Sequence, residues 1–561
     1  MKRHGRMVKW IILVGTLLST VFFLNLTPLE SDDEYYKIDR GLFYLKEVFE
    51  TVSRSYVDHV DPETLSRSAI NGMLKEFDPY TVFFEDPGSH QMRMITRGKY
   101  GGVGMEIGVQ NSRITVIAPM ENTPAWRAGI RAGDEVVSIE GKSTEGFSLD
   151  ETSQKLRGKV GSKVSLKIRR PGIPDPIPYD LIREEILLKD VSYAAFILPE
   201  VAYIRLAGFS DKAGDELREA LRDLQSQQHI SGVILDLRDN PGGLLTSAVE
   251  VANVFLPPGQ LVVSTRGTHE SENKFYTKRR PLLATEPLVV LVNEASASAS
   301  EIVAGAIQDL DRGVLIGADT FGKGLVQKVF PIDRVSQTYL KITTAKYYIP
   351  SGRSIQKEDY KSNSRMFTDH SDSSEYNPAI NFYTQNGRIV HGGGGVNPDI
   401  QVASDTLDGY LEAITARGFL FRFAVEYLTR HPESKNANHL MVDENIMAEF
   451  ENFVVKEKLE VPMDGEEELR RFLSIAEDKK YDQDVRDLVT VSLQKLAYRK
   501  TRQFSDHRAQ IRQLLEAEFA EKLTGSTARI RTLLNYDGQV KQALKVLENQ
   551  PKYEQILAVD R

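Results

Sequence analysis

The sequence predicts a multidomain α+β protein in which a parallel β-sheet core lies between helical regions. A chain of 561 residues is too long for one hydrophobic core, so about three or four domains are expected. Between Leu288 and Ile316, an apolar β-branched run, a helical pattern and a second apolar run follow one another, which is the order of a βαβ unit. Long stretches near both ends of the chain instead repeat apolar residues at helical spacing.

The start of the chain predicts a membrane anchor. A basic segment at 1–9 precedes an uncharged apolar run at 10–26, whose length is at the short end of what spans a bilayer. Small residues that would mark a cleaved signal peptide are missing near the end of the run, so an uncleaved transmembrane signal anchor is favoured over cleavage. Basic residues before the span place segment 1–9 in the cytoplasm. We therefore expect a single-pass inner-membrane protein whose remaining chain lies in the periplasm or cell envelope.

The composition disfavours several classes of function. The chain has no cysteine, which excludes disulfides and thiol catalysis. Its formal net charge is −8 and it has no basic block of the kind that binds nucleic acid. The 10 histidines show no metal-ligand spacing. We expect no metal, no cofactor and no nucleic-acid partner.

Residues 35–90 and 95–185 differ in their pattern. The first region carries two apolar stripes at helical spacing, which predict helices, and Asp78-Pro79 ends the second stripe. The second region has short strand patterns separated by glycine turns, with a helix predicted over Leu149 to Leu156. The two stripes are Leu42, Leu45, Val48, Val52 and Tyr56, and Ile70, Met73, Leu74 and Phe77.

Polar residues that can carry chemistry follow the predicted core strands. Ser298 follows the strand Leu288 to Val292 and opens a helical pattern, and Lys323, between two glycines, follows the strand Val314 to Ile316. The segment 239–243 follows a third buried strand, Val233 to Leu237. Catalytic groups in βαβ units gather at the carboxyl ends of the strands, so these three loops are expected to meet.

Each of these two polar residues also has an alternative interpretation. Ser298 to Glu301 fits a helix capping box, in which the serine only satisfies a backbone N–H. The segment 317–323 has the spacing of a phosphate-binding P-loop, but Gly324 stands where that motif needs Ser or Thr, and the residues after it alternate like a strand. Nucleotide binding is therefore disfavoured.

Three motifs together resemble the C-terminal processing (tail-specific) proteases. They are SASASE around Ser298, FGKG around Lys323 with Gln327 after it, and LDLRDNPGG at 235–243, and the resemblance covers roughly residues 40–403. It implies a crotonase-like peptidase core at 191–403 and a serine endopeptidase in which Ser298 is the nucleophile. It also implies Lys323 as general base and Gln327 as an accessory residue. Arg353, in a similar segment after these motifs, is expected to be a structural or a substrate contact.

The residues themselves suggest where an oxyanion would be stabilised. The N–H of Ala299 lies at the start of the predicted helix, where the free N–H groups and the positive end of the dipole favour negative charge. Gly242 or Gly243 could supply a second N–H, because a glycine backbone can approach closely. The sequence does not decide between the two glycines.

Region 95–185 resembles a PDZ domain of the protease type. Gly102-Val103-Gly104-Met105 stands where such domains bind a terminal carboxylate, and the bound chain would pair as an added strand. Met105 and Ile107 share one strand face and are expected to contact the terminal side chain, with the helix Leu149 to Leu156 as the other wall. The expected partners are proteins with unfolded or accessible C-termini.

Residues 405–561 predict a helical domain. One amphipathic helix is expected through Leu411, Ile414, Phe421, Val425 and Leu428, and Pro462 and Gly525-Ser526 break the later helical pattern. This domain could mediate homodimerisation, dock an adaptor, or form a lid on the core. The alternative function for the whole chain is a non-catalytic PDZ adaptor with an inert peptidase-like core.

Overall fold

The computed structural model describes residues 30–85, 94, 96–333, 335, 338–357, 380–403, 409–436 and 440–558. The chain divides into two compact units, Met1–Phe83 and Phe84–Arg561. The expected anchor at 10–26 lies outside the described residues. Within the described ranges, no helix combines the length and the apolar character needed to cross a membrane.

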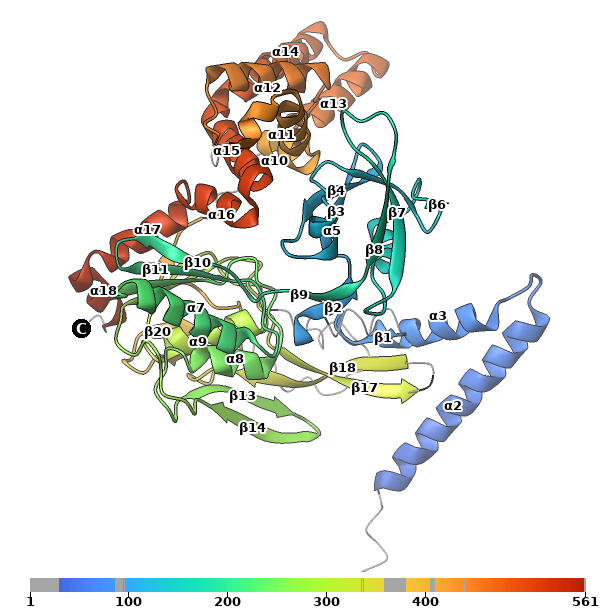
Figure 1. The fold of residues 1–561 in the computed structure, drawn as a ribbon. Coiled ribbons are helices and arrows are strands. Elements are labelled where there is room, and N and C mark those ends of the chain that lie inside the picture. Colours follow the sequence, from blue (N-terminus) through green and yellow to red (C-terminus); the bar gives the residue numbers. More distant parts are fainter. Residues whose placement is uncertain are drawn as a thin grey trace, which may run out of the picture. The chain divides into compact units, whose positions relative to one another are not determined.

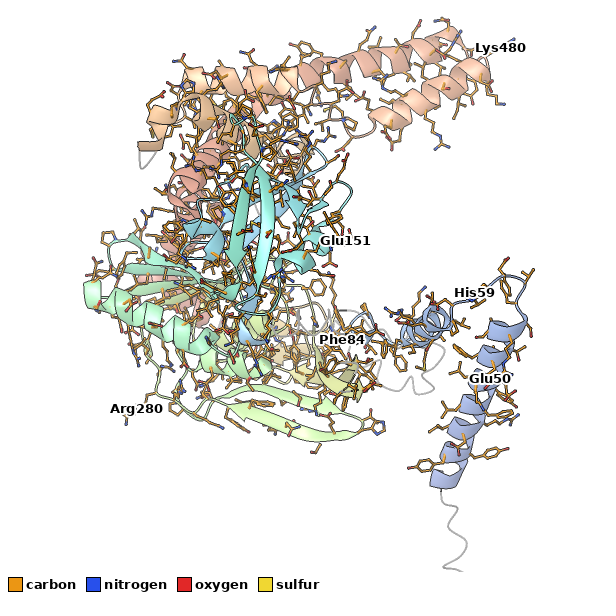
Figure 2. The ribbon with its side chains drawn as sticks, turned by 45° about the vertical axis from the view of Figure 1, so that its right-hand side comes forward. Glu50, His59, Phe84, Glu151, Arg280 and Lys480 are labelled. Carbon is orange, nitrogen blue, oxygen red and sulfur yellow. The ribbon has the colours of Figure 1, made fainter. Side chains whose placement is uncertain are left out.

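The described residues of the first unit form the helices α2 (Glu30–Ser55) and α3 (Pro62–Leu74). Figure 2 marks Glu50 on α2 and His59 in the segment that connects the two helices. Asp61 caps α3 by accepting a hydrogen bond from the Thr64 N–H at 2.9 Å, and Pro62 occupies the first turn, where its missing N–H costs nothing. The predicted helices are thus confirmed. Strand β1 (Val82–Phe84) spans the boundary between the units.

A six-stranded sheet forms the core of the second unit (Figure 1). In spatial order its strands are β10 (Val191–Leu198), β11 (Val201–Leu206), β12 (Gly232–Asp236), β15 (Leu288–Val292), β16 (Val314–Gly317) and β21 (Ile400–Gln401). All neighbouring pairs are parallel except β10 and β11. Strands β12, β15 and β16 are fully buried, which explains why their sequences are continuous apolar runs.

Helices cover both faces of this sheet (Figure 1). On one face lie α7 (Ala213–Gln227), α8 (Leu245–Ala252) and α9 (Ala299–Asp309), which share a core with Ile204, Leu235 and Val290. On the other face lie the last two helices of the chain, α17 (Gly538–Leu547) and α18 (Gln550–Leu557). Their Val540, Ala543 and Tyr553 pack with the strand residues Ile234 and Leu291. The end of the chain therefore completes the core of the sheet.

Two antiparallel hairpins extend from the core. The first, β13 (Leu261–Gly267) with β14 (Glu270–Tyr276), is the hairpin that the polar region before β15 could form. The second, β17 (Leu325–Asp333) with β18 (Thr338–Tyr348), begins directly after Lys323. Strand β18 also pairs with β13, and β19 (Asn381–Tyr383) pairs with β20 (Ile389–His391). The short helix that a P-loop would need is replaced by a strand.

The region that resembles a PDZ domain is an antiparallel sheet with two helices. Its strands are β3 (Met105–Gln110), β4 (Arg113–Pro119), β5 (Glu135–Ile139), β6 (Lys142–Ser143), β7 (Lys163–Arg169) and β8 (Ile177–Ile182). Its helices are α5 (Pro124–Arg127) and α6 (Leu149–Leu156), and α6 has the predicted bounds. Ser148 and Glu151 form a capping box that starts α6, and Figure 2 labels Glu151. The strands β2 (Lys99–Gly102) and β9 (Glu184–Leu187) pair where the chain enters and leaves this region.

Within the described residues, a series of helical segments follows the core sheet before α17. They are α10 (Gly409–Ala416), α11 (Phe419–Arg430), the 3₁₀ helix η2 (Pro432–Asn436), α12 (Glu444–Lys456), α13 (Glu466–Asp478), α14 (Gln483–Asp506), α15 (Arg508–Thr524) and α16 (Ser526–Leu534). The prediction of one helix through Leu411 and Leu428 was wrong, because Gly418 has a φ of 68° and separates α10 from α11. Phe423, Phe450 and Phe519 form the centre of this helical bundle. Lys480 lies in the turn between α13 and α14 (Figure 2).

The packing of α17 generates a test of the fold. Replacing Ala543, which is fully buried against the sheet, by Asp should lower the free energy of unfolding by roughly 3–5 kcal/mol, because the carboxylate would be buried without a partner. The matched variant Lys545→Asp changes an exposed residue of the same helix and should cost less than about 0.5 kcal/mol. Urea unfolding measures both. Equal stabilities of the two variants would contradict the packing of α17 on the sheet.

Candidate active site

Ser298 is the N-cap residue of α9, beyond the end of β15. Its backbone has a φ of 57° and a ψ of −111°, which is a strained conformation for serine. A residue that only caps a helix does not need this strain, since the other capping side chains among the described residues all have a negative φ. Those caps are Asp61, Ser148, Asp443, Asp537 and Asn549, with φ values of −74°, −72°, −82°, −61° and −115°. Strain of this kind is typical of a nucleophile held on a sharp strand-to-helix turn.

The Glu301 carboxylate joins the two loops that carry Ser298 and Lys323. Its Oε2 accepts hydrogen bonds from the Ser298 N–H at 2.8 Å and from the Lys323 N–H at 2.9 Å. Its Oε1 accepts from the Gly322 N–H at 2.7 Å and from the Thr320 hydroxyl at 2.6 Å. Because one oxygen accepts both amides, the Ser298 and Lys323 nitrogens are no farther apart than those two distances together. The structure thus brings the two predicted residues to one place.

The Lys323 loop is also held by hydrogen bonds to residues other than Glu301. The Gly324 N–H donates to Gln356 Oε1 at 2.7 Å, and the Tyr347 hydroxyl donates to the Lys323 carbonyl. Gly322 has a φ of 86°, and a Cβ added there would lie 2.5 Å from the Lys357 Cβ, so this position requires glycine. Lys323 itself is half-buried. Its backbone is therefore fixed while part of its side chain still meets solvent.

The residues next to Lys323 in the sequence differ in their burial. Leu325 is buried, but Phe321 is 48 % exposed and does not form the apolar wall that a neutral amine would favour. Gln327 lies on β17 opposite Thr343, and its amide donates to the Thr343 hydroxyl at 3.3 Å. Since β17 starts two residues after Lys323, the P-loop interpretation is wrong.

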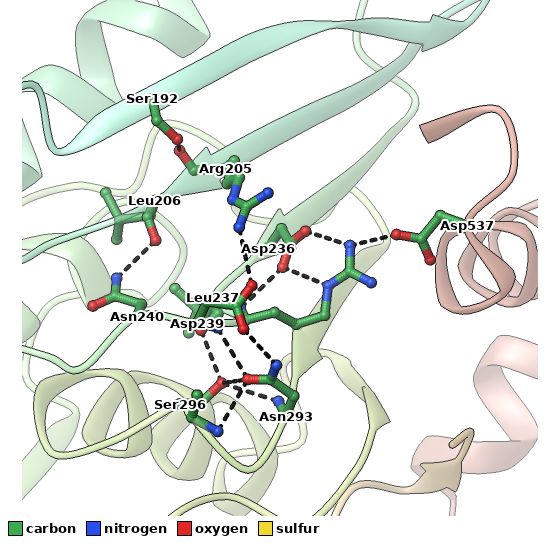
Figure 3. A network of polar contacts seen from close by, with 12 residues as sticks. Ser192, Arg205, Leu206, Asp236, Leu237, Asp239, Asn240, Asn293, Ser296 and Asp537 are labelled. Atoms are coloured by element: carbon green, nitrogen blue, oxygen red, sulfur yellow. Dashed lines mark hydrogen bonds and ion pairs between the residues drawn. The ribbon is translucent and has the colours of Figure 1, made fainter. Parts of the chain in front are cut away.

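The loop 239–243, which follows β12 and Arg238, lies directly against Ser298. Figure 3 labels Asp239 and Asn240 of this loop. The fully buried Asn240 accepts hydrogen bonds on its carbonyl from the Ala297 N–H at 3.0 Å and from the Ser300 hydroxyl at 2.9 Å. Gly242 has a φ of 91°, and a Cβ added there would lie 2.9 Å from the Ser298 Cβ. No other residue type fits so close to the serine. Three loops from three strand ends therefore meet, as the sequence predicted.

A second set of contacts fixes the base of this loop (Figure 3). Asp239 and Asn293 exchange two hydrogen bonds, one from the Asp239 N–H at 3.0 Å and one from the Asn293 amide at 2.9 Å. The Ser296 hydroxyl donates to the Leu237 carbonyl at 2.8 Å. The strand end at β12 and the loop after β15 are therefore connected by side chains as well as by the sheet.

The predicted peptide-binding residues extend from Gly102, the last residue of β2, to Ile107 on β3. Val103 and Met105 are buried in the core of the PDZ-like region, and Met105 is only 8 % exposed. Gly104 has a φ of 72°, and its carbonyl accepts from the Thr123 hydroxyl at 2.8 Å. Ile107 is half-buried. The role of Gly102 to Ile107 in binding a chain terminus stays a prediction.

Some residues of the site were not identified from the sequence. Glu301 was considered only as a capping partner, and Asn240, Tyr347 and Gln356 were given no role. One signal was present, since Glu301 is an acid among the small and apolar residues that begin α9, and the structure buries all 11 residues of this helix. Arg353 is fully buried and pairs with Asp309 at 2.8 Å, so it is a structural residue and not a substrate contact.

The chain matches four protein families along its length. Residues 200–366 match peptidase family S41, and residues 115–170 match the PDZ domain. Residues 410–547 match the C-terminal helical domain of probable PDZ-proteases, and residues 27–87 match the N-terminal domain of the activating protease CtpB. The carboxy-terminal-processing protease of Bartonella bacilliformis is 40 % identical over 314 residues, which are 55 % of this chain and 71 % of that protease. The chain belongs to the carboxy-terminal-processing protease family.

Other members of the family are more distant. The carboxy-terminal processing protease CtpB of Bacillus subtilis is 33 % identical over 323 residues, which are 57 % of this chain and 66 % of CtpB. The solved structure of a photosystem II D1 C-terminal processing protease is 27 % identical, covers 64 % of this chain and 92 % of its own, and has a TM-score of 0.34. This member of the carboxy-terminal-processing proteases is thus a serine peptidase with a PDZ domain and a C-terminal helical domain, and its substrates are proteins.

The ionisation of Glu301 in this protease depends on its burial. Burial raises the pKa of Glu301 from 4.5 to about 7, although the hydrogen bonds from Thr320, Lys323, Ser298 and Gly322 lower it. A group whose pKa is raised on folding stabilises the folded state fully below its unfolded pKa. That stabilisation is lost as the pH rises through the folded pKa. The relevant window is therefore between about pH 4.5 and 7.

This linkage predicts a pH dependence that one substitution removes. The wild-type protease should lose about 3 kcal/mol of unfolding free energy through Glu301 as the pH rises across this window, at about 1.4 kcal/mol per pH unit. Glu301→Gln should lack this slope, because its amide does not titrate. Glu219→Gln, which changes an exposed residue of α7, should show the same dependence of unfolding free energy on pH as the wild type. Urea unfolding from pH 4.5 to 8 measures the difference, and parallel curves for wild type and Glu301→Gln would refute the linkage.

Proposed function

We propose that this protease cleaves proteins from their C-terminal ends through an acyl-enzyme on Ser298, with Lys323 as general base on a crotonase-like core. One observation carries the proposal, namely that Glu301 Oε2 accepts from the backbone N–H groups of both residues. The strained backbone of Ser298 and the close approach of Gly242 support the same assignment.

The proposed reaction has two halves. In the first, the neutral Lys323 amine takes the Ser298 hydroxyl proton as the serine oxygen attacks the scissile carbonyl carbon. The C–N bond then breaks, the amine product leaves with that proton, and the Ser298 ester remains. In the second half, water attacks the ester with Lys323 again as base, and the serine leaves with its proton restored. Gln327 is proposed to orient Lys323 or the serine hydroxyl from its place on β17.

The oxyanion of each tetrahedral intermediate is proposed to bind the N–H groups of Ala299 and Gly243. Ala299 is the first residue of α9, where the N–H groups have no intrahelical acceptor. The Gly242 N–H already donates to Asn240 Oδ1 at 2.9 Å. For the Gly243 N–H, the described residues offer no acceptor in hydrogen-bond range, which favours Gly243 as the second donor. Gly242 then has a steric role, because its lack of a side chain allows the loop 239–243 to lie close to Ser298.

The PDZ domain is proposed to bind the C-terminal end of the substrate, with β3 pairing to the added strand and α6 as the opposite wall. The basic segment 1–9 and the apolar run 10–26 support a membrane anchor, with the peptidase in the periplasm or cell envelope. The substrates would then be envelope proteins with accessible C-termini. A non-catalytic adaptor is disfavoured, because nothing about a binding module requires strain at Ser298.

The assignment of the nucleophile predicts the effect of Ser298→Ala. This variant should cleave an unfolded, C-terminally tagged protein about 10⁴–10⁶-fold more slowly than wild type, because no acyl-enzyme can form. Ser271→Ala, on the exposed strand β14, should cleave at the wild-type rate. Cleavage is followed by gel electrophoresis and mass spectrometry. Undiminished turnover by Ser298→Ala would reject the nucleophile.

The assignment of the base predicts the effect of Lys323→Arg. A guanidinium cannot lose its proton in a protein, so this variant should be inactive although its charge and length are similar. Lys328→Arg is the matched control, because Lys328 lies on β17, shortly after Lys323 in the chain, and pairs with Glu270 on the surface. The same cleavage assay applies. Activity of Lys323→Arg near the wild-type level would exclude lysine as the base.

A further inference from the structure

The start of α17, where Figure 3 labels Asp537, contacts Arg238, which directly precedes the loop 239–243. Asp537 caps this helix, because its Oδ1 accepts from the Val540 N–H at 3.0 Å. Its Oδ2 lies 2.8 Å from Arg238 Nη2. Gln539, which is 3 % exposed, accepts from Arg238 Nη1 at 3.1 Å and donates to the Val402 carbonyl at 2.9 Å. One end of one helix therefore holds Arg238 with two side chains.

Arg238 is otherwise held by the strand that precedes it. Its Nε and its backbone N–H both lie 2.9 Å from Asp236 Oδ1, and Asp236 is fully buried at the end of β12. Burial by itself would lower the pKa of Arg238, but the carboxylates of Asp236 and Asp537 outweigh it and raise that pKa. The guanidinium is thus a permanent charge with one carboxylate from the sheet and one from the helical domain.

The residues that follow Arg238 contact the segment that carries Ser298. Asp239 is fixed to Asn293 at two points, and its φ of 60° leaves little freedom at this position. The Asn240 carbonyl accepts a hydrogen bond from the Ala297 N–H, and a Cβ added to Gly242 would lie 2.9 Å from the Ser298 Cβ. A shift of Arg238 would therefore move the loop that carries the proposed oxyanion donor.

We propose that Asp537 is a positioning residue of the peptidase site, which holds Arg238 and thereby keeps loop 239–243 against Ser298. The C-terminal helical domain is then a part of the active site and not only a surface for partners or a lid. The inference rests on the proposed function, since it concerns the loop that would bind the oxyanion. It gives the helical domain a role that no motif in its sequence indicates.

The kinetic test compares two aspartates that cap helices in the same way. Asp443 caps α12 by accepting from the Ile446 N–H at 2.9 Å, within the helical bundle. Asparagine is also a good cap, so Asp537→Asn and Asp443→Asn both keep the cap and remove one charge. Asp537→Asn should lower kcat about tenfold at constant KM, which is less than the roughly 10²–10³-fold cost of losing an oxyanion donor. Asp537→Glu should recover most of the rate, and Asp443→Asn should match wild type.

A second measurement does not depend on catalysis. Hydrogen exchange of the 238–243 amides should be faster in Asp537→Asn than in wild type or Asp443→Asn. Lower kcat together with faster exchange supports the positioning role. The absence of either change, or equal effects in Asp443→Asn, overturns it. If the wild-type chain cleaves no protein, the proposed function fails, and exchange alone then decides whether Asp537 positions the loop.

Discussion

The site depends on one buried carboxylate that two distant loops share. Glu301 sits in the first turn of α9, where the free N–H groups favour negative charge, and its Oε2 accepts from Ser298 and Lys323. The two loops follow the paired strands β15 and β16, and the Phe321 N–H also donates to the Ser296 carbonyl at 3.1 Å. The Glu301 oxygen adds the contact that joins the Ser298 and Lys323 amides themselves. The capping interpretation and the catalytic one are therefore compatible, because the same Glu301 contact that caps α9 also brings Lys323 to the serine.

The core that supports this carboxylate is assembled from both halves of the second unit. Helix α9 packs on one face of the parallel sheet, while α17 and α18, from the C-terminal helical domain, pack on the other. The contacts of Asp537 and Gln539 with Arg238 extend this packing to the loop beside Ser298. These contacts connect the last helices of the chain to a loop at the carboxyl end of the sheet.

Local patterns were sufficient to predict the strands, the helix after Ser298 and the meeting of three loops, because each follows from periodicity and from the geometry of parallel strands. The break at Gly418 was missed because amphipathic spacing continues through a positive φ. The contact between Arg238 and Asp537 joins residues far apart in the chain, and no local pattern predicts it.

The central claim is that one carboxylate holds the Ser298 and Lys323 amides, and a titration of these two amides tests it most directly. Nuclear magnetic resonance of protein labelled with ¹⁵N at serine and lysine would follow both signals from pH 5 to 9. The account predicts that both amides shift with one common midpoint, near the pKa of about 7 for Glu301, and that neither shift occurs in Glu301→Gln. Different midpoints for the two amides, or shifts that persist in that variant, would contradict the account.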